Sequence, residues 1–185
     1  MVLEEIGLAF WFLLPAYAAN PMAVVFGGGT PIDFRRSMRD GHRILGDGKT
    51  WRGLAGGIGS GLLLGIALMI IGSAVSPRLS FGPWPLVVRV LILLPIGALL
   101  GDMFGAFVKR RLGLERGERA PGLDQYDFLL GTFLLSLVFE RDWWLERYWN
   151  GDAIYGIVFI ILITPVLHRA VNMIGYRWGK KREPW

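Results

Sequence analysis

Residues 53–77 read GLAGGIGSGLLLGIALMIIGSAVSP, and none of these 25 side chains carries a charge. A helix needs about 20 predominantly apolar residues to cross the hydrocarbon core of a bilayer. The stretch therefore predicts a transmembrane helix. Its repeated glycines predict close packing on neighbouring helices, because a residue without a side chain lets two backbones approach.

The remainder of the chain supplies four more apolar stretches of comparable length. The fourth of the five is the weakest, because Phe128 to Phe139 contains only 12 uncharged residues. This helix either extends to about Trp144 or begins with its acidic first turn in a water-filled recess. We expect an all-α integral membrane protein with one domain over residues 1–185. Its five transmembrane helices are expected over residues 6–26, 53–76, 85–107, 125–144 and 153–176.

The composition agrees with this class and raises the question of where the charges lie. Hydrophobic residues make up 53% of the 185 residues, yet the formal net charge is +5. The mean hydropathy is +0.44. The chain has no cysteine, which excludes disulfides and a thiolate metal site. The charged residues must therefore gather in loops or in a protein-lined recess rather than face lipid.

The basic residues predict the orientation in the membrane. With five spans, 16 of the 20 Lys and Arg residues fall on one face, in loops 27–52 and 108–124 and at the C-terminal end. Cytoplasmic loops carry an excess of such residues. We therefore expect a multi-pass protein of the cell membrane with its N-terminus outside and its C-terminus in the cytoplasm. No feature points to nucleic acid.

Three carboxylates are expected at the cytoplasmic interface. Asp102 lies near the inner end of one expected span, and Asp124 and Asp127 open the next, three residues apart on one helical face. An ionisable residue inside a span is costly and is usually functional. The alternatives are an ion pair between Asp102 and Lys109, and helix capping by the other two aspartates. Oxygen ligands without His or Cys favour Mg²⁺, with all three aspartates as candidate ligands.

The inner loop is a candidate anion site. Residues 46–53 read GDGKTWRG, but the P-loop pattern requires glycine where Arg43 stands, and no strand precedes the loop. A weaker prediction remains, in which backbone N–H groups bind an anion together with Lys49, Thr50 and Arg52. The alternative is a solvated turn that caps the following helix. His42 and His168 show no metal spacing, so neither is assigned a catalytic role.

Together these segments resemble a known family. GDMFGAFVKRRLG at 101–113, PGLDQYDF at 121–128 and the 46–53 loop resemble the archaeal CDP-archaeol synthases, distant relatives of the CDP-diacylglycerol synthases. The resemblance covers nearly the whole chain. The chain keeps a Lys-Arg pair and an Asp-x-x-Asp element of the wider signature. It lacks the Lys-Asp and His-Gly-Gly elements between them and has RGERAP at 116–121 instead.

The resemblance implies an activity and a set of site residues. A member of this family would transfer CMP from CTP to the phosphate of a diether lipid, an unsaturated archaetidic acid, in phospholipid biosynthesis. Asp102, Asp124, Asp127 and Lys109 would be catalytic, with the aspartates binding Mg²⁺. The glycine-rich spans would leave a groove for the prenyl chains of the substrate. Other membrane lipids would lie around the protein. The candidate substrate-binding residues are Asn20, Asp47, Lys49, Thr50, Arg52, Arg110 and Arg111.

Two other functions would also use charged groups within membrane helices, and the sequence specifies no oligomeric state. A CDP-alcohol phosphotransferase also uses clustered aspartates in membrane helices, but its motif requires glycine after the second aspartate, where this chain has Phe128. A small transporter or channel subunit would place charges along a path at the midplane of the bilayer. Here the charges are expected at one face, which favours the cytidylyltransferase.

Overall fold

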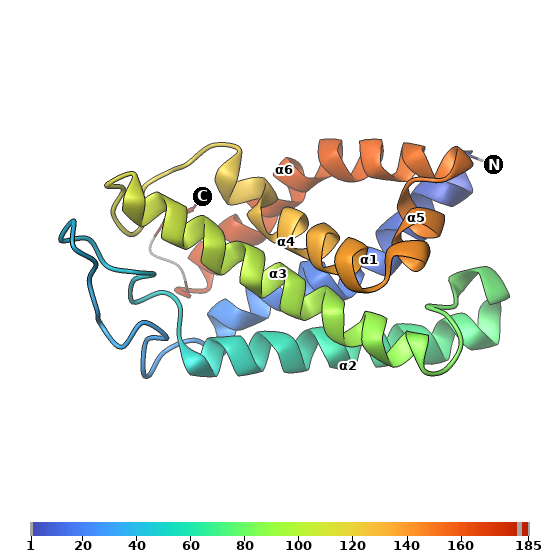
Figure 1. Cartoon of the computed structure of the whole chain (residues 1–185), viewed down its shortest axis with the longest axis horizontal. Helices are drawn as coiled ribbons and strands as arrows, with labels where there is room; N and C mark the ends of the chain where they lie inside the picture. The colour runs from blue at the N-terminus through green and yellow to red at the C-terminus, as the bar shows by residue number, and fades with distance from the viewer. Residues whose placement is uncertain (1, 181–182, 185) are drawn as a thin grey trace.

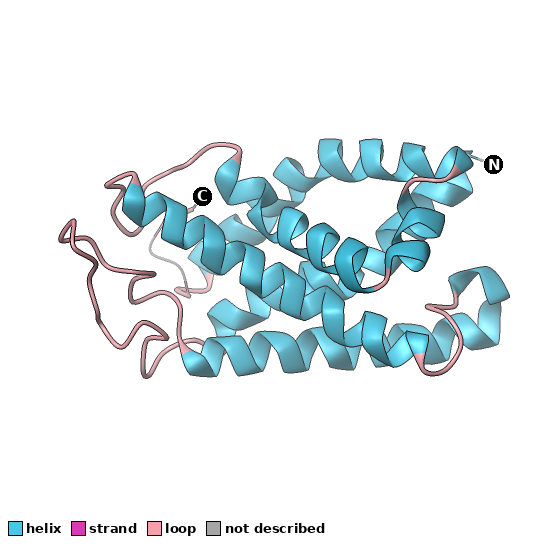
Figure 2. Cartoon of the chain, viewed as in Figure 1, coloured by secondary structure: helices cyan, strands magenta, loops and turns pink. Residues whose placement is uncertain are grey.

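The computed structural model describes residues 2–180 and 183–184, and within these residues it is helical with no strand (Figures 1 and 2). The long helices run side by side along the long axis of the molecule. The elements in chain order are α1 (Val2–Val25), α2 (Trp51–Val75), η1 (Pro77–Leu79), α3 (Leu86–Arg111), α4 (Leu123–Phe139), α5 (Arg141–Tyr148), η2 (Gly151–Ala153) and α6 (Ile154–Arg177).

Among the residues that the structure describes, four stretches are long and apolar enough to cross a membrane: α1, α2, α3 and Gly151–Arg177. Their outward faces carry large apolar side chains. Leu63 on α2 and Leu162 on α6, for example, are each 70% exposed. A water-soluble bundle of this size rarely leaves such rows uncovered. The protein is therefore an integral membrane protein whose exposed rows suit lipid.

The glycines of α2 form the contact with α1 and α3, as the sequence predicted. A Cβ on Gly61 would lie 2.8 Å from the carbonyl oxygen of Pro15, and one on Gly57 would lie 2.7 Å from that of Ala19. At Gly57 and Gly61 the neighbouring helices fill the space, so these two glycines do not line a groove for prenyl chains. Gly59 is different, since nothing lies within 4 Å of its Cβ position.

The contact between α3 and α4 is equally close and holds a candidate site residue. A Cβ on Gly97 would lie 2.7 Å from Cα of Thr132, and one on Gly101 would overlap the carbonyl of Asp127. A Cβ on Gly105 would overlap the side chain of the same aspartate. Small residues on α3 thus set how close Asp127 comes to that helix.

The helix expected over 125–144 is instead two helices. α4 ends at Phe139, and Glu140 adopts φ −135° and ψ 56°, outside the helical region. Its carboxylate pairs with Arg89 of α3. The turn lets α5 bring Trp144 and Tyr148 back into the core. The 17-residue α4 therefore matches the second possibility, in which the helix begins with its acidic turn in a polar recess.

Candidate active site

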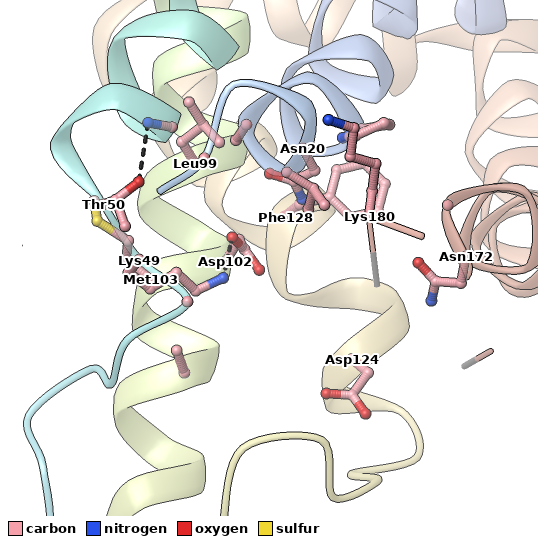
Figure 3. Close-up of a pocket in the computed structure, with 18 of the residues that line it drawn as sticks. Asn20, Lys49, Thr50, Leu99, Asp102, Met103, Asp124, Phe128, Asn172 and Lys180 are labelled. Carbon is pink, nitrogen blue, oxygen red and sulfur yellow. Dashed lines mark hydrogen bonds and ion pairs between the residues drawn. The ribbon is translucent and has the colours of Figure 1, made fainter. Parts of the chain in front are cut away.

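A cavity of about 940 Å³ lies at the end of the bundle where the 26–50 loop, the α3–α4 connection and the C-terminal end of α6 meet. Its walls come from α1, this loop, the start of α2, and from α3, α4 and α6. Figure 3 shows the cavity with the residues that line it. Pockets of roughly 300–1,000 Å³ hold a drug-sized ligand, so this cavity has room for a nucleotide and part of a second molecule.

The loop that forms one rim is organised around a buried aspartate. Asp33 accepts hydrogen bonds from Arg43 Nη2 at 2.7 Å, from the Leu45 backbone N–H at 3.0 Å and from that of Gly46 at 2.9 Å. Burial alone would raise the pKa of its carboxyl, but Arg43 and the backbone donors together hold that pKa well below its usual range. A fixed anion thus shapes the segment that leads to Lys49.

Sequence reasoning missed Asp33. It belongs to no motif, and its importance follows only from the donors that the folded loop turns toward it. Thr50, the residue after Lys49, caps α2. Its Oγ1 accepts a hydrogen bond from the Gly53 N–H at 3.1 Å. The capping alternative is therefore realised for this residue, which also lines the cavity.

Two lysine–aspartate pairs link separate elements across the cavity. The Lys49 ammonium from the loop pairs with Asp102 of α3, as the dashed line in Figure 3 marks. Lys109 Nζ of α3 lies 2.8 Å from Asp124 Oδ1 of α4. The alternative ion pair between Asp102 and Lys109 is thus replaced by these cross-element pairs. The two pairs thus connect the loop, α3 and α4 around one cavity.

The three aspartates were expected to converge. The two that lie on α4, Asp124 and Asp127, have different surroundings. Asp127 is 8% exposed, and its Oδ1 accepts from the Phe128 N–H at 2.6 Å. Asp124 Oδ2 accepts from the Ala120 N–H at 2.7 Å. All three aspartates line one cavity. Within residues 2–180 and 183–184, however, no three acidic or histidine side chains form a ready metal cluster, so the convergence is looser than expected.

The donor set nevertheless suits a hard divalent cation. The cavity presents the carboxylate oxygens of Asp102, Asp124 and Asp127. Mg²⁺ commonly uses one or two protein carboxylates and fills its remaining positions with water and substrate phosphate oxygens. A pair such as Asp102 and Asp127, on the closely packed α3 and α4, meets that requirement without a third ligand.

The structure divides the candidate substrate-binding residues into two groups. Asn20, Asp47, Lys49, Thr50 and Arg110 line the cavity, whereas Arg52 and Arg111 are not among its lining residues.

Arg111 instead fastens the loop to α3. It reaches Asp40 Oδ2 at 2.6 Å and the carbonyl oxygen of Arg43 at 2.6 Å. Arg116, which was not proposed from the sequence, does line the cavity. The loop anchor and the cavity surface thus use different arginines.

The wall opposite the lysine–aspartate pairs is mainly polar and uncharged, with Lys180 beside Asn20 at its edge (Figure 3). Of its residues, Asn20 was the one proposed from the sequence. Tyr17 Oη and Thr164 Oγ1 lie 2.6 Å apart, and the Asn172 amide lies 3.2 Å from a ring nitrogen of His168. The α6 residues are spaced by four, which places them on one helical face. Polar residues at that spacing within an apolar helix were the signal that could have revealed this wall.

Fold and site together define a class: a helical membrane protein with a charged recess large enough for a nucleotide at one end of its bundle. Comparison with known proteins is specific within this class. The family model of CarS-like CDP-archaeol synthases matches residues 2–185. The chain belongs to the CDP-archaeol synthase family, which confirms the resemblance seen in the sequence and decides against both alternatives.

Individual relatives cover nearly the full length. CDP-archaeol synthases from Methanoregula boonei and Pyrococcus horikoshii are 45% and 40% identical, over 94% and 100% of this chain and all of each relative. A solved structure described as an intramembrane enzyme for archaeal membrane lipids biosynthesis is 36% identical. It matches with a TM-score of 0.63 over 88% of this chain and 94% of its own.

Proposed function

We propose that this enzyme transfers CMP from CTP to the phosphate of di-geranylgeranylglyceryl phosphate, an unsaturated archaetidic acid, and releases pyrophosphate. The product would be CDP-archaeol, a precursor of archaeal phospholipids. The observation that carries the proposal is the pair of Lys–Asp contacts, Lys49–Asp102 and Lys109–Asp124, that face one cavity in a member of this family. Such a cavity offers positive charge to phosphates and carboxylates to a divalent cation.

The reaction asks for alignment and charge neutralisation more than for a strong base. An oxygen of the lipid phosphate attacks the α-phosphorus of CTP, and the bond from that phosphorus to the bridging oxygen of the β-phosphate breaks. A phosphate monoester has its second pKa near 6, so the nucleophile is already anionic at neutral pH. The protein contributes by holding both phosphates in line.

The side chains of the cavity have separate tasks in this proposal. Lys49, Lys109 and Arg110 bind phosphate oxygens, since cations placed in a recess stabilise charge that develops during transfer. Asp102, Asp124 and Asp127 are the candidate ligands, one or two of which would hold Mg²⁺. When bound, the ion supplies charge neutralisation at the attacked phosphate and at the leaving pyrophosphate.

The proposed topology places this cavity at the cytoplasmic interface of the cell membrane. Helices α1, α2, α3, α4 and α6 would cross, with the N-terminus outside and the C-terminus in the cytoplasm. The positive-inside rule supports this orientation, because the basic loops border the cavity. At 1.5 Å per residue the 17-residue α4 is about 26 Å long, so it spans only if its first turn lies in the polar recess.

The absence of cysteine makes this topology directly testable. Ser37→Cys in the 26–50 loop should resist a membrane-impermeant maleimide in intact cells and react after lysis. Asp152→Cys near the start of α6 should react in both. The reverse pattern would contradict the orientation.

The catalytic proposal is tested with purified protein, Mg²⁺, CTP and the lipid phosphate. Asp124→Asn removes the charge that pairs with Lys109 and should release almost no pyrophosphate. Asp142→Asn makes the same change at the exposed start of α5 and should match the wild type. Wild-type turnover by Asp124→Asn protein would contradict the proposed role, and a wild type without CTP-dependent pyrophosphate release would contradict the function.

A further inference from the structure

The 26–50 loop carries an exposed aromatic ring beside the start of α2. Phe34 is 60% exposed and Trp51, the first residue of α2, is 48% exposed. The centroids of their two rings lie 6.4 Å apart. Neither residue is among those that line the cavity, so the pair does not belong to the substrate site. Two adjacent exposed rings outside the cavity form an apolar surface that calls for another partner.

Phe34 lies in a backbone conformation that bulky residues seldom adopt. Its φ is 48° and that of Arg35 is 62°, both in the left-handed region. Hydrogen bonds fix this turn, because the Phe34 N–H donates to the carbonyl oxygen of Pro31 at 3.0 Å. The Arg35 N–H donates to Asp33 Oδ1 at 3.1 Å. Left-handed backbone at a bulky residue costs energy, so an exposed ring held in this way points to a function for the ring.

The start of α2 sets the depth of the aromatic pair in the membrane. α2 is one of the helices long and apolar enough to cross, and tryptophan at the end of such a helix marks the membrane–water interface. The loop is fastened to this end. The Trp51 N–H donates to the carbonyl oxygen of Thr30 at 3.2 Å, and the Ile32 N–H donates to that of Lys49 at 2.8 Å. Because the Phe34 ring lies beside the Trp51 ring, it lies at the same interface.

Two basic residues follow the exposed ring. Arg35 and Arg36 are exposed, and neither guanidinium has an ion-pair or hydrogen-bond partner among the residues that the structure describes. Arg43 of the same loop, by contrast, pairs with Asp33. Guanidinium groups bind phosphate oxygens through paired N–H donors. Two such arginines beside an interfacial ring therefore suit the phosphates of lipid headgroups.

We infer that residues 34–36 bind the surface of an anionic bilayer, with the Phe34 ring among the headgroups and the two arginines on lipid phosphates. An apolar ring with adjacent positive charges holds a protein segment at such a surface. The loop leads directly to Lys49, so this docking holds the segment beside the cavity. The inference goes beyond the proposed function and does not depend on which substrates occupy the cavity.

The experiment measures how close the loop comes to lipid headgroups in nanodiscs that hold a single copy of the protein. The chain has no cysteine, so Ser37→Cys gives one site for an NBD fluorophore next to the arginines. Discs of phosphatidylcholine are compared with discs that also contain anionic phosphatidylglycerol, each with headgroup spin-labelled lipid as the quencher. Quenching should be at least about twofold stronger in the anionic discs at low salt. The difference should vanish at about 1 M salt, which screens charges beyond about 3 Å.

Two changes separate the contribution of the ring from that of the charges. Phe34→Asn removes the ring but tolerates the left-handed backbone, so quenching should fall in both kinds of disc. Arg35→Gln combined with Arg36→Gln should remove most of the difference between the discs, because each basic residue near an anionic surface contributes about a fivefold preference. Arg141→Gln makes the same change at the exposed start of α5 and should alter neither result.

A fluorophore at Glu115→Cys is the control for position. This residue lies in the exposed connection after α3, and α3 continues past the level at which α2 begins (Figure 1). It should be quenched weakly in both kinds of disc. Equal quenching at Ser37→Cys in the two lipid compositions, or quenching no stronger than at Glu115→Cys, would overturn the inference.

Two further outcomes would also count against the inference. An equal loss of quenching from Arg141→Gln would show a general effect of charge. Quenching differences that appear only in discs with two copies of the protein would assign the surface to a second chain. Should the double arginine variant fail to fold, the salt dependence of the labelled protein with its arginines intact decides, and quenching that does not change with salt overturns the inference.

Discussion

The two ends of the helical bundle are built from the same helices but differ in their interior: one is filled with aromatic side chains, and the other opens into a cavity. At the aromatic end, Phe12, Phe81, Trp143, Trp144 and Tyr148 are buried against one another, with ring centroids of Phe12 and Phe81 5.1 Å apart. At the cavity end, the same bundle opens around about 940 Å³ lined by charged and polar groups.

The difference shows where this membrane protein obtains its stability. Lipid removes most of the hydrophobic driving force between helices, so close packing must hold the bundle together. Aromatic rings bury large areas and supply that packing at one end. The other end can then retain ionised groups. Changes at the two ends should therefore separate stability from catalysis.

The largest expected effect is on stability at the aromatic end. Tyr148 is fully buried, and Tyr148→Ala should cost about 3–5 kcal/mol of unfolding free energy, because it leaves a large cavity. In detergent this corresponds to a melting temperature lower by roughly 10 °C. Below that temperature kcat should stay near the wild-type value.

Tyr148→Phe provides the matched comparison. Its hydroxyl has no partner among the described residues, so removing that group should leave stability unchanged or slightly higher. A fall in kcat at low temperature for either variant would show that the two ends are coupled.

The next effect is on activity at the cavity end. Lys49→Met removes the ammonium that pairs with Asp102 while keeping the length of the side chain. Pyrophosphate release should fall by about 10²–10³-fold, the usual loss when one group that stabilises developing charge is removed. The melting temperature should change little, since this residue is outside the packed core.

Arg52→Met tests the boundary of the cavity. Arg52 was a candidate from the sequence but is not among the lining residues, so its loss should change kcat/KM by only a few-fold. Equal losses for Lys49→Met and Arg52→Met would mean that both residues act through the general positive charge of the loop.

The smallest effect concerns the rim loop. The folded pKa of Asp33 lies below its unfolded value, so its stabilisation is present at neutral pH and is lost as the pH falls through the folded pKa. Asp33→Asn should weaken the loop by about 1.5–3 kcal/mol, because charge-assisted hydrogen bonds disappear. Trypsin cleavage after Arg36 and Arg39 at pH 7.5 should accelerate.

Asp40→Asn is the control for this experiment. Its carboxylate is exposed and pairs with Arg111 at the outside of the loop, where solvent screens the interaction. A smaller acceleration is expected. The same rate for both variants would show that the buried carboxylate does not organise the rim.

Periodic and compositional features were the most predictable part of the molecule. The charge-free run at 53–77, the close packing of its glycines and the separation of basic loops from apolar spans all follow from local sequence. The motif residues Asp102, Lys109 and Asp124, which line the cavity, were also predicted from the sequence. Local spacing is enough to predict these features. Helix geometry fixes which residues share a face, and bilayer thickness fixes the length of a spanning helix.

Contacts between distant segments were less predictable. Asp102 pairs with Lys49, 53 residues away, instead of with Lys109 on its own helix. The break at Glu140 depends on aromatic side chains that fold back onto α1 and α4, which the apolar run alone does not reveal. Asp33 gains its role from backbone donors that exist only in the folded loop.

Sequence by itself determined that the chain is a helical membrane protein and the family to which its motifs belong. These properties depend on residue type and spacing. Tertiary structure decided which charges pair and which arginines reach the cavity. Those outcomes depend on close approach between helices, and at Gly57, Gly61 and Gly101 that approach is limited by single missing side chains.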